Sequence, residues 1–328
     1  MDTRMDNRIK VAVIGAGFFG QRHAKTYFDL KECELVGVVD PNLERAKEIA
    51  RQCQCQAFSD VAPLLGRMDA ASIVTHTLAH YETAKRLLAE GIDIFIEKPM
   101  TSTLSEADEI NHIAHQKTHI VQVGHIERFN PAFHKLKEHV TSPRFIECHR
   151  IGPFLNRATD VSVVLDLMIH DIDLILSIVP SEIQHIDAVG TSVITDEIDI
   201  ANARLSFVNG AVANITASRI SEERVRKIRI FQEEEYLSLN FLNQTLAIHR
   251  PIERPGEQWP SVIAEKFSFE KGDPLKDELS AFMKSVETRS PPIVSGREGR
   301  RALAVALQII DLIKISANLG ISPDFKNN

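Results

Sequence analysis

The pattern of apolar and polar positions divides the chain into two parts. Over the first 125 residues, short β-rich apolar runs alternate with stretches whose apolar positions recur at helical spacing. One such stretch, residues 104–115, follows a Thr103-x-x-Glu106 pattern that is typical of a helix N-terminus. Because strands that alternate with helices favour a parallel sheet covered on both faces, we predict a doubly wound α/β domain. The predicted strands are residues 10–14, 35–39, 71–75, 92–96 and 119–123.

Beyond residue 125 the pattern changes to strands that follow one another with little helix between them. The dipeptide Asn209-Gly210 separates two of these runs and is typical of a type I′ hairpin turn. We predict an α+β domain built on an antiparallel sheet, closed by helices that begin at Asp273-Pro274 and after a Ser295-x-x-Glu298 box. The Pro-rich segment 250–267 is predicted to be an irregular surface loop. The predicted strands are residues 144–150, 183–193, 201–207, 211–218, 226–231 and 236–240.

Composition limits the classes of partner and compartment. The 328-residue chain suits two domains, which we place at residues 1–125 and 126–328, with the C-terminal helices able to pack back on the first. A net charge of −7 argues against nucleic acid or an anionic membrane as the main partner, and no apolar run is long enough to span a bilayer. The cysteines show no disulfide spacing, and Cys53 and Cys55 lack the second pair that a zinc site needs. With no signal-like N-terminus, we expect a cytoplasmic protein without a metal.

A glycine-rich loop follows the first predicted strand and opens the first predicted helix. It runs Gly15-Ala16-Gly17-Phe18-Phe19-Gly20, and Asp40 follows 20 residues later at the end of the second strand. In this context G-x-G-x-x-G places a pyrophosphate at a helix N-terminus, and the acidic residue accepts hydrogen bonds from a ribose hydroxyl. The alternative is a glycine-rich turn that binds nothing. Because a carboxylate at Asp40 would repel a 2′-phosphate, we expect NAD rather than NADP.

The triplet Glu97-Lys98-Pro99 ends a buried strand at the carboxyl edge of the predicted parallel sheet, the edge where such sheets bind ligands. A lysine there can polarise or hydrogen-bond a substrate hydroxyl beside the cofactor. The alternative interpretation is an ordinary surface lysine that closes a strand.

A polar stripe crosses the very apolar helical segment 161–179. Asp166, His170, Asp173 and Ser177 fall on one helical face, and a buried helix must direct such a stripe toward a cavity or other polar groups. Asp166 can orient the His170 imidazole across one turn, an arrangement suited to a general base. A buried structural Asp–His pair is the alternative. Asp171 lies off the stripe and is expected to be structural.

Together these motifs resemble the Gfo/Idh/MocA oxidoreductase family over nearly the whole chain, as does the closing stretch 277–296. The resemblance implies a Rossmann domain joined to an open-faced antiparallel sheet, with a sugar or cyclitol as substrate. It also implies that Lys98 and His170 form the acid–base pair, supported by Asp166. His76 departs from the small polar residues usual in the family. The implied cofactor contacts are Gly15, Gly17, Phe18, Phe19, Gly20, Asp40, Thr75, His76, Glu97 and Lys98.

Residues 123–132 and 160–170 are also similar to the nucleotide-sugar dehydrogenases of this family. Those enzymes oxidise C3 of UDP-N-acetylglucosamine for a later aminotransferase, which places them in lipopolysaccharide and lipid A biosynthesis. The resemblance makes Arg128, Asn130 and Arg157 candidates for sugar or diphosphate contacts, because arginine binds phosphate bidentately. Each could equally be a surface or interdomain residue. With Lys98 and the Asp166–His170 pair they form the predicted substrate site.

Two alternatives to a nucleotide-sugar dehydrogenase stay open. One is a free-sugar or inositol dehydrogenase of the same family, which needs no arginines for a diphosphate. The other is a non-catalytic sensor of NAD and sugar, which would be expected to lack the acid–base residues.

We also expect a homodimer or homotetramer. One face of the predicted sheet needs a cover, and the sequence places Ile186, Ala188, Ile215 and Ala217 on the face that would associate.

Overall fold

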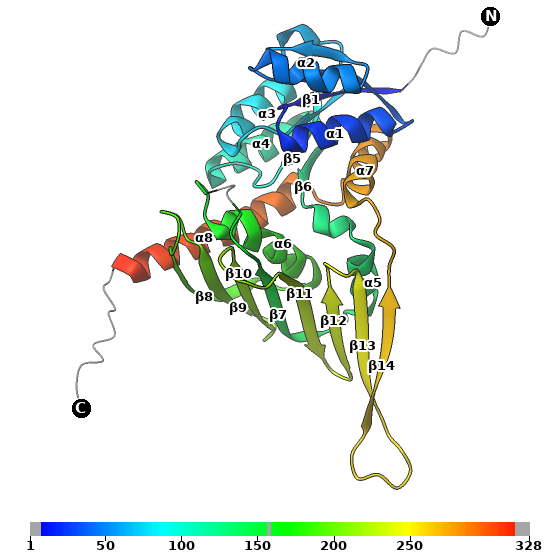
Figure 1. Cartoon of the computed structure of the whole chain (residues 1–328), viewed down its shortest axis with the longest axis vertical. Coiled ribbons are helices and arrows are strands. Elements are labelled where there is room, and N and C mark those ends of the chain that lie inside the picture. The colour runs from blue at the N-terminus through cyan, green and yellow to red at the C-terminus, as the bar shows by residue number, and fades with distance from the viewer. Residues whose placement is uncertain (1–7, 156–158, 319–328) are drawn as a thin grey trace, which may run out of the picture. The chain divides into compact units, whose positions relative to one another are not determined.

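The computed structural model describes residues 8–155 and 159–318. They form two compact units, one holding the residues up to Phe129 with Asp273–Leu303 and the other holding Asn130–Gly272 with the residues from Ala304 (Figure 1). No helix among these residues is long and apolar enough to cross a membrane.

The first unit is built on a six-stranded parallel sheet with strand order β3-β2-β1-β4-β5-β6. Strands β4, β5 and β6 are fully or almost fully buried, and β1 is buried from Val11 onward, because helices cover both faces. This explains why their sequences are mostly apolar. The short strand β3 escaped the sequence analysis. The strands are β1 Ile9–Ile14, β2 Cys33–Val39, β3 Gln56–Phe58, β4 Ala70–Ile73, β5 Asp93–Glu97 and β6 Val121–Gly124.

Helices α2, α4 and α7 of the first unit begin at residues whose side chains cap them. Thr103 and Glu106 form the predicted reciprocal capping box of α4, and Asp273 accepts from the Lys276 amide at the start of α7. The α-helices are α1 Phe18–Asp29, α2 Leu43–Gln52, α3 His80–Ala89, α4 Leu104–Lys117, α7 Pro274–Thr288 and the beginning of α8 Gly296–Asn318. Short 3₁₀ turns lie at η1 Ala62–Leu64, η2 Thr77–Ala79 and η3 Ile126–Phe129.

Helix α7 returns from late in the sequence to complete the first unit. Its Phe282 ring lies 5.9 Å from that of Phe95 on β5, and both belong to one buried core. The Gln122 side chain donates to the Glu278 carbonyl at 2.9 Å. This late segment therefore folds as part of the first unit.

The second unit is built on an eight-stranded sheet with strand order β14-β13-β12-β11-β7-β10-β9-β8. All its pairs are antiparallel except β7 with β10, which run parallel, so the sheet is mostly rather than wholly antiparallel. The strands are β7 Pro143–Ile151, β8 Ile183–Thr191, β9 Ile200–Phe207, β10 Val212–Ser218, β11 Val225–Gln232, β12 Glu235–Asn240, β13 Thr245–Ile252 and β14 Ser261–Ser268.

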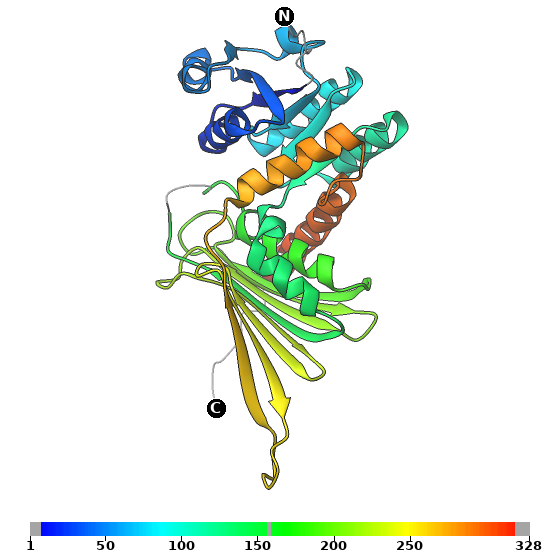
Figure 2. The same cartoon turned by 90° about the vertical axis from the view of Figure 1, so that its right-hand side faces the viewer.

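Helices cover one face of this sheet. Figure 2 shows α5 Pro131–His139 and α6 Ile169–Ile178 on that face, and α6 continues directly from a π-helical turn at Val164–Met168. The expectation that Ile186, Ile215 and Ala217 face outward was wrong. They are buried within the single chain, and the alternate positions of the same strands form the open face.

Two local predictions for the second unit were also wrong. The segment 250–267 is not a loop: its ends belong to β13 and β14, which pair in register and extend beyond the other strands (Figure 1). Most side chains of β14 are exposed, so no alternation of burial marks it in the sequence. The hairpin predicted at Asn209-Gly210 is present between β9 and β10, but its turn type was predicted wrongly. The turn is a three-residue loop in which only Gly210 has positive φ, unlike a type I′ turn.

Candidate active site

The glycine loop of the first unit has the geometry of a phosphate cradle. Gly15 has φ +110°, and a Cβ there would lie 2.6 Å from the Val74 carbonyl oxygen. A Cβ at Gly20 would lie 1.9 Å from the Gly15 carbonyl oxygen, while a Cβ at Gly17 would meet nothing within 4 Å. Gly17 caps α1 without a side-chain acceptor, so the first backbone N–H groups of the helix can bind an anion.

Asp40 closes the other side of this loop. Its carboxylate accepts from the Ala16 amide at 2.7 Å and from the Asn42 amide at 2.8 Å, which fixes its orientation. Asp40, Gly15, Gly17, Thr75 and His76 all line one cavity of about 650 Å³, a volume suited to a nucleotide. These residues therefore fit the pyrophosphate and ribose of NAD. Phe18 and Phe19 stand beside the loop, exposed and packed edge to face.

Glu97 and Lys98 lie at the carboxyl end of β5, as predicted. Glu97 Oε1 lies 3.1 Å from Nε2 of the fully buried His23, and Glu97 Oε2 accepts from the Lys98 amide at 3.2 Å. Burial acts to raise the pKa of Glu97, but the hydrogen bond from His23 and the charges of His23 and Lys98 outweigh it and lower that pKa. Glu97 is therefore an ionised anchor for the backbone of Lys98.

His80 links this strand end to the neighbouring one. Its ring nitrogens lie 3.0 Å from the Pro99 carbonyl oxygen and 3.1 Å from the Thr75 carbonyl oxygen. The loops that follow β4 and β5 are thus held together by one buried side chain.

In the second unit, Asp166 and His170 lie on one helical segment, but it is not a regular α-helix. Asp166 belongs to the π-helical turn, and His170 to the first turn of α6. π-Helical turns are rare and frequent at functional sites, and nothing in the residue spacing predicts one. Both side chains are half-buried. Ser177, also on the predicted stripe, donates to the Leu174 carbonyl of its own helix.

Asp171 is structural, as its position off the stripe suggested. The buried Arg150 donates to both of its carboxylate oxygens, at 3.0 and 2.8 Å, so the pair ties α6 to β7.

The similarity to nucleotide-sugar dehydrogenases suggested three further residues as substrate contacts. Arg128 is buried in the first unit and donates to Glu298 at 2.7 Å and to the Ile293 carbonyl at 3.4 Å. Asn130 belongs to the second unit and caps α5 by accepting from the Ala132 amide at 3.0 Å. Arg157 lies outside the described residues. Substrate contacts at these three positions stay a prediction.

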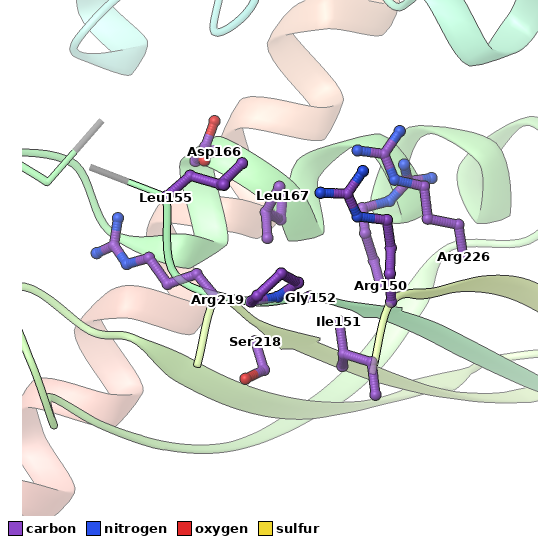
Figure 3. Close-up of a pocket in the computed structure, with 11 residues that line it drawn as sticks. Arg150, Ile151, Gly152, Leu155, Asp166, Leu167, Ser218, Arg219 and Arg226 are labelled. Atoms are coloured by element: carbon purple, nitrogen blue, oxygen red, sulfur yellow. The ribbon is translucent and has the colours of Figure 1, made fainter. Parts of the chain in front are cut away.

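A cavity of about 470 Å³ in the second unit was not predicted. Asp166 lines it together with residues from the ends of β7, β10 and β11, among them four arginines (Figure 3). The arginines come from three separate parts of the sequence, so spacing could not have grouped them: Arg150, Arg219, Arg224 and Arg226. No group of three or more potential metal ligands gathers within the described residues.

Known protein families and solved structures resemble this chain in sequence and in fold. A family model described as "Oxidoreductase family, NAD-binding Rossmann fold" matches residues 9–125, and one described as "GFO/IDH/MocA C-terminal domain" matches residues 134–238. The first match confirms the predicted NAD-binding Rossmann domain. A structure of an oxidoreductase from Agrobacterium radiobacter in complex with NAD+, L-tartaric acid and magnesium shares the fold at 16% identity, covering 94% of this chain and 97% of that one with a TM-score of 0.82.

Two relatives match most of the chain. UDP-N-acetylglucosamine 3-dehydrogenase from Acidithiobacillus ferrooxidans is 38% identical over 92% of this chain and 96% of its own. A solved structure of that enzyme has a TM-score of 0.88 and covers 94% of this chain and 98% of that one. Myo-inositol 2-dehydrogenase from Thermotoga maritima is 24% identical over 90% of this chain and 93% of its own.

Proposed function

The chain belongs to the GFO/IDH/MocA family of oxidoreductases and is an NAD-dependent dehydrogenase, and we propose that it oxidises C3 of UDP-N-acetylglucosamine to the 3-keto nucleotide sugar. The observation that carries this proposal is the 38% identity to the UDP-N-acetylglucosamine 3-dehydrogenase of Acidithiobacillus ferrooxidans, which extends over nearly the full length of both chains. The likeness to an inositol dehydrogenase at 24% identity makes a free polyol the alternative substrate.

The proposal gives three side chains distinct tasks. His170 takes the proton of the substrate hydroxyl, and Asp166 orients the His170 ring. Lys98 donates a hydrogen bond to the hydroxyl oxygen as negative charge develops on that oxygen. When bound, NAD supplies the acceptor for the hydride that leaves the carbon. The Glu97 carboxylate supports this scheme by holding the backbone at Lys98.

The position of oxidation is tested by marking the new carbonyl. The product of UDP-N-acetylglucosamine and NAD is reduced with borodeuteride, and the deuterium is located by NMR. We expect deuterium at C3 of the hexosamine. Deuterium at any other carbon would refute the assignment.

The role of Lys98 is tested with Lys98→Met, against Lys314→Met as a control at an exposed lysine. General acid–base catalysis contributes about 10²–10⁴-fold, so kcat should fall by that factor in Lys98→Met while NAD binding, followed by fluorescence, is retained. A variant that keeps more than about a tenth of kcat would exclude this role. NAD binding without any turnover by the native protein would favour the non-catalytic sensor.

We also propose that the protein self-associates through the open face of the second-unit sheet. Four aromatic rings lie in a row across that face, with successive centroids 5.7, 4.7 and 4.9 Å apart, and they belong to Phe145, Phe231, Tyr236 and His249. Light scattering should give a dimer or tetramer at micromolar concentration, and a monomer would contradict the proposal.

We also propose a cytoplasmic location. The four cysteines are free thiols in the structure, which supports that location.

A further inference from the structure

Asp166 and four arginines line one cavity of the second unit. Figure 3 shows Arg150 and Arg226 at one end of it and Arg219 toward the other, with Asp166 and Leu167 on the helical segment above them. All the lining residues belong to the second unit. Its volume of about 470 Å³ lies within the usual range for small-molecule sites.

The strand register brings two of these arginines face to face. Arg226 on β11 is the direct antiparallel partner of Arg150 on β7. Like charges opposite each other destabilise a sheet, and a guanidinium cannot shed its proton to relieve the repulsion. A register that keeps two arginines opposite each other at the wall of a cavity is therefore suited to an anion bound beside them.

Two of the four arginines are fixed by buried carboxylates. Asp171 holds Arg150 through both of its oxygens. Asp199 accepts from Arg219 at 2.8 Å and also from the Val193, Ile194 and Thr195 amides. These partners set the orientation of the two guanidinium groups, so they form a rigid wall.

The other two arginines add charge on the open side of the cavity. Arg224 is exposed, Arg226 is half-buried, and both lie at or just before the start of β11. Asp166 is the one carboxylate among the described residues that line the cavity. Four arginines and one carboxylate therefore line this cavity, in a chain whose net charge is −7.

We propose that this arginine-lined cavity binds the diphosphate of the nucleotide sugar, with Arg224 and Arg226 as its direct contacts and Arg150 and Arg219 as its fixed wall. The inference rests on the proposed function, because it takes a UDP sugar as the substrate. Asp166 lines the same cavity, so a ligand whose diphosphate contacts the arginines has its sugar beside the residue that orients His170.

The test measures calorimetric binding of UDP to the full chain, with N-acetylglucosamine as a probe that lacks the diphosphate. The variants are Arg224→Gln, Arg226→Gln and the double variant. Arg229→Gln is the matched control, because Arg229 lies on the same strand but faces the opposite side of the sheet, where it pairs with Glu147 at 3.1 Å. Arg226→Lys keeps the charge at its position, and a thermal melt of each variant checks that it is folded.

We expect UDP to bind the native protein, with an affinity that falls as salt is raised. Each single Gln variant should lose about 10- to 100-fold in affinity, the usual effect of removing a charged hydrogen-bond donor. Arg226→Lys should keep more affinity than Arg226→Gln, and Arg229→Gln should match the native protein. UDP affinity unchanged in a folded double variant would overturn the inference.

Turnover separates this inference from the function on which it rests. If UDP-N-acetylglucosamine is oxidised but KM is unchanged in the Arg224 and Arg226 variants, the diphosphate site is wrong and the function stands. If no UDP sugar is oxidised while UDP binding still depends on these arginines, the proposed function is wrong and the anion site stands.

Discussion

Replacing the buried His23 tests how the protein holds Lys98. His23 is fully buried, and its Nε2 lies 3.1 Å from Oε1 of Glu97, whose other oxygen accepts from the Lys98 amide. A hydrogen bond to a charged group contributes about 1.5–3 kcal/mol, so His23→Leu should lower the free energy of unfolding by that amount. The same variant should lower kcat, because the backbone of Lys98 loses part of its support. His23→Gln, whose amide can still donate, should recover most of both losses.

The pH dependence of this effect follows from the pKa of Glu97. That pKa is lowered in the folded protein, because the hydrogen bond and charge of His23 and the charge of Lys98 outweigh the opposing effect of burial. A carboxyl group of this kind contributes stability above its unfolded pKa, about 4.3, and loses the contribution as pH falls through its folded pKa. The difference in unfolding free energy between native protein and His23→Leu should therefore be full near neutral pH and shrink in acid.

Urea unfolding at neutral and acidic pH, together with steady-state kinetics, measures these effects. His115→Leu is the control, because His115 is an exposed histidine on α4. A His23→Leu protein with native stability and native kcat would refute the anchoring role. A stability loss that stays constant with pH would show that it arises from packing and not from the charge of Glu97.

Three further predictions concern single residues. Asp40→Ser should raise KM for NAD about tenfold and reduce the preference for NAD over NADP, measured from initial rates with both cofactors. An unchanged preference for NAD would contradict the role of the carboxylate. Gly15→Ala should abolish NAD binding and lower the melting temperature, since it adds a Cβ against a backbone oxygen at a φ of +110°, whereas Gly17→Ala should leave the melting temperature unchanged. Arg128→Met should lower the free energy of unfolding in urea by about 1–2 kcal/mol through loss of its partly exposed ion pair. A higher KM for the UDP sugar without that stability loss would instead assign Arg128 to the substrate.

The sequence predicted best those features that a short residue pattern marks. The Thr103–Glu106 capping box is set by contacts within a few positions. The glycine loop and the strand that ends at Glu97 also show a local pattern of residue types, although Gly15 is required by the distant Val74 carbonyl. The mostly apolar strands of the first unit are equally recognisable, because burial on both faces leaves little room for polar residues.

The features that escaped depend on contacts between distant segments. Most side chains of β14 are exposed, so the β13–β14 hairpin is determined by strand pairing and not by burial. Arg150 and Arg226 meet only because β7 and β11 are neighbours in the sheet, and Glu97 meets His23 across 74 positions. The π-helical turn at Asp166 follows from backbone hydrogen bonding that side-chain periodicity does not report.

The most direct measurement follows NADH absorbance when the protein and NAD are offered UDP-N-acetylglucosamine, its uronic acid, UDP-glucose, free N-acetylglucosamine and myo-inositol in parallel. A carbonyl trap or a partner aminotransferase removes the ketone, so that an unfavourable equilibrium does not mask the reaction. The account predicts NADH formation with UDP-N-acetylglucosamine and none with the free sugar or the cyclitol. NADH formation with myo-inositol or free N-acetylglucosamine, and none with any UDP sugar, would contradict it.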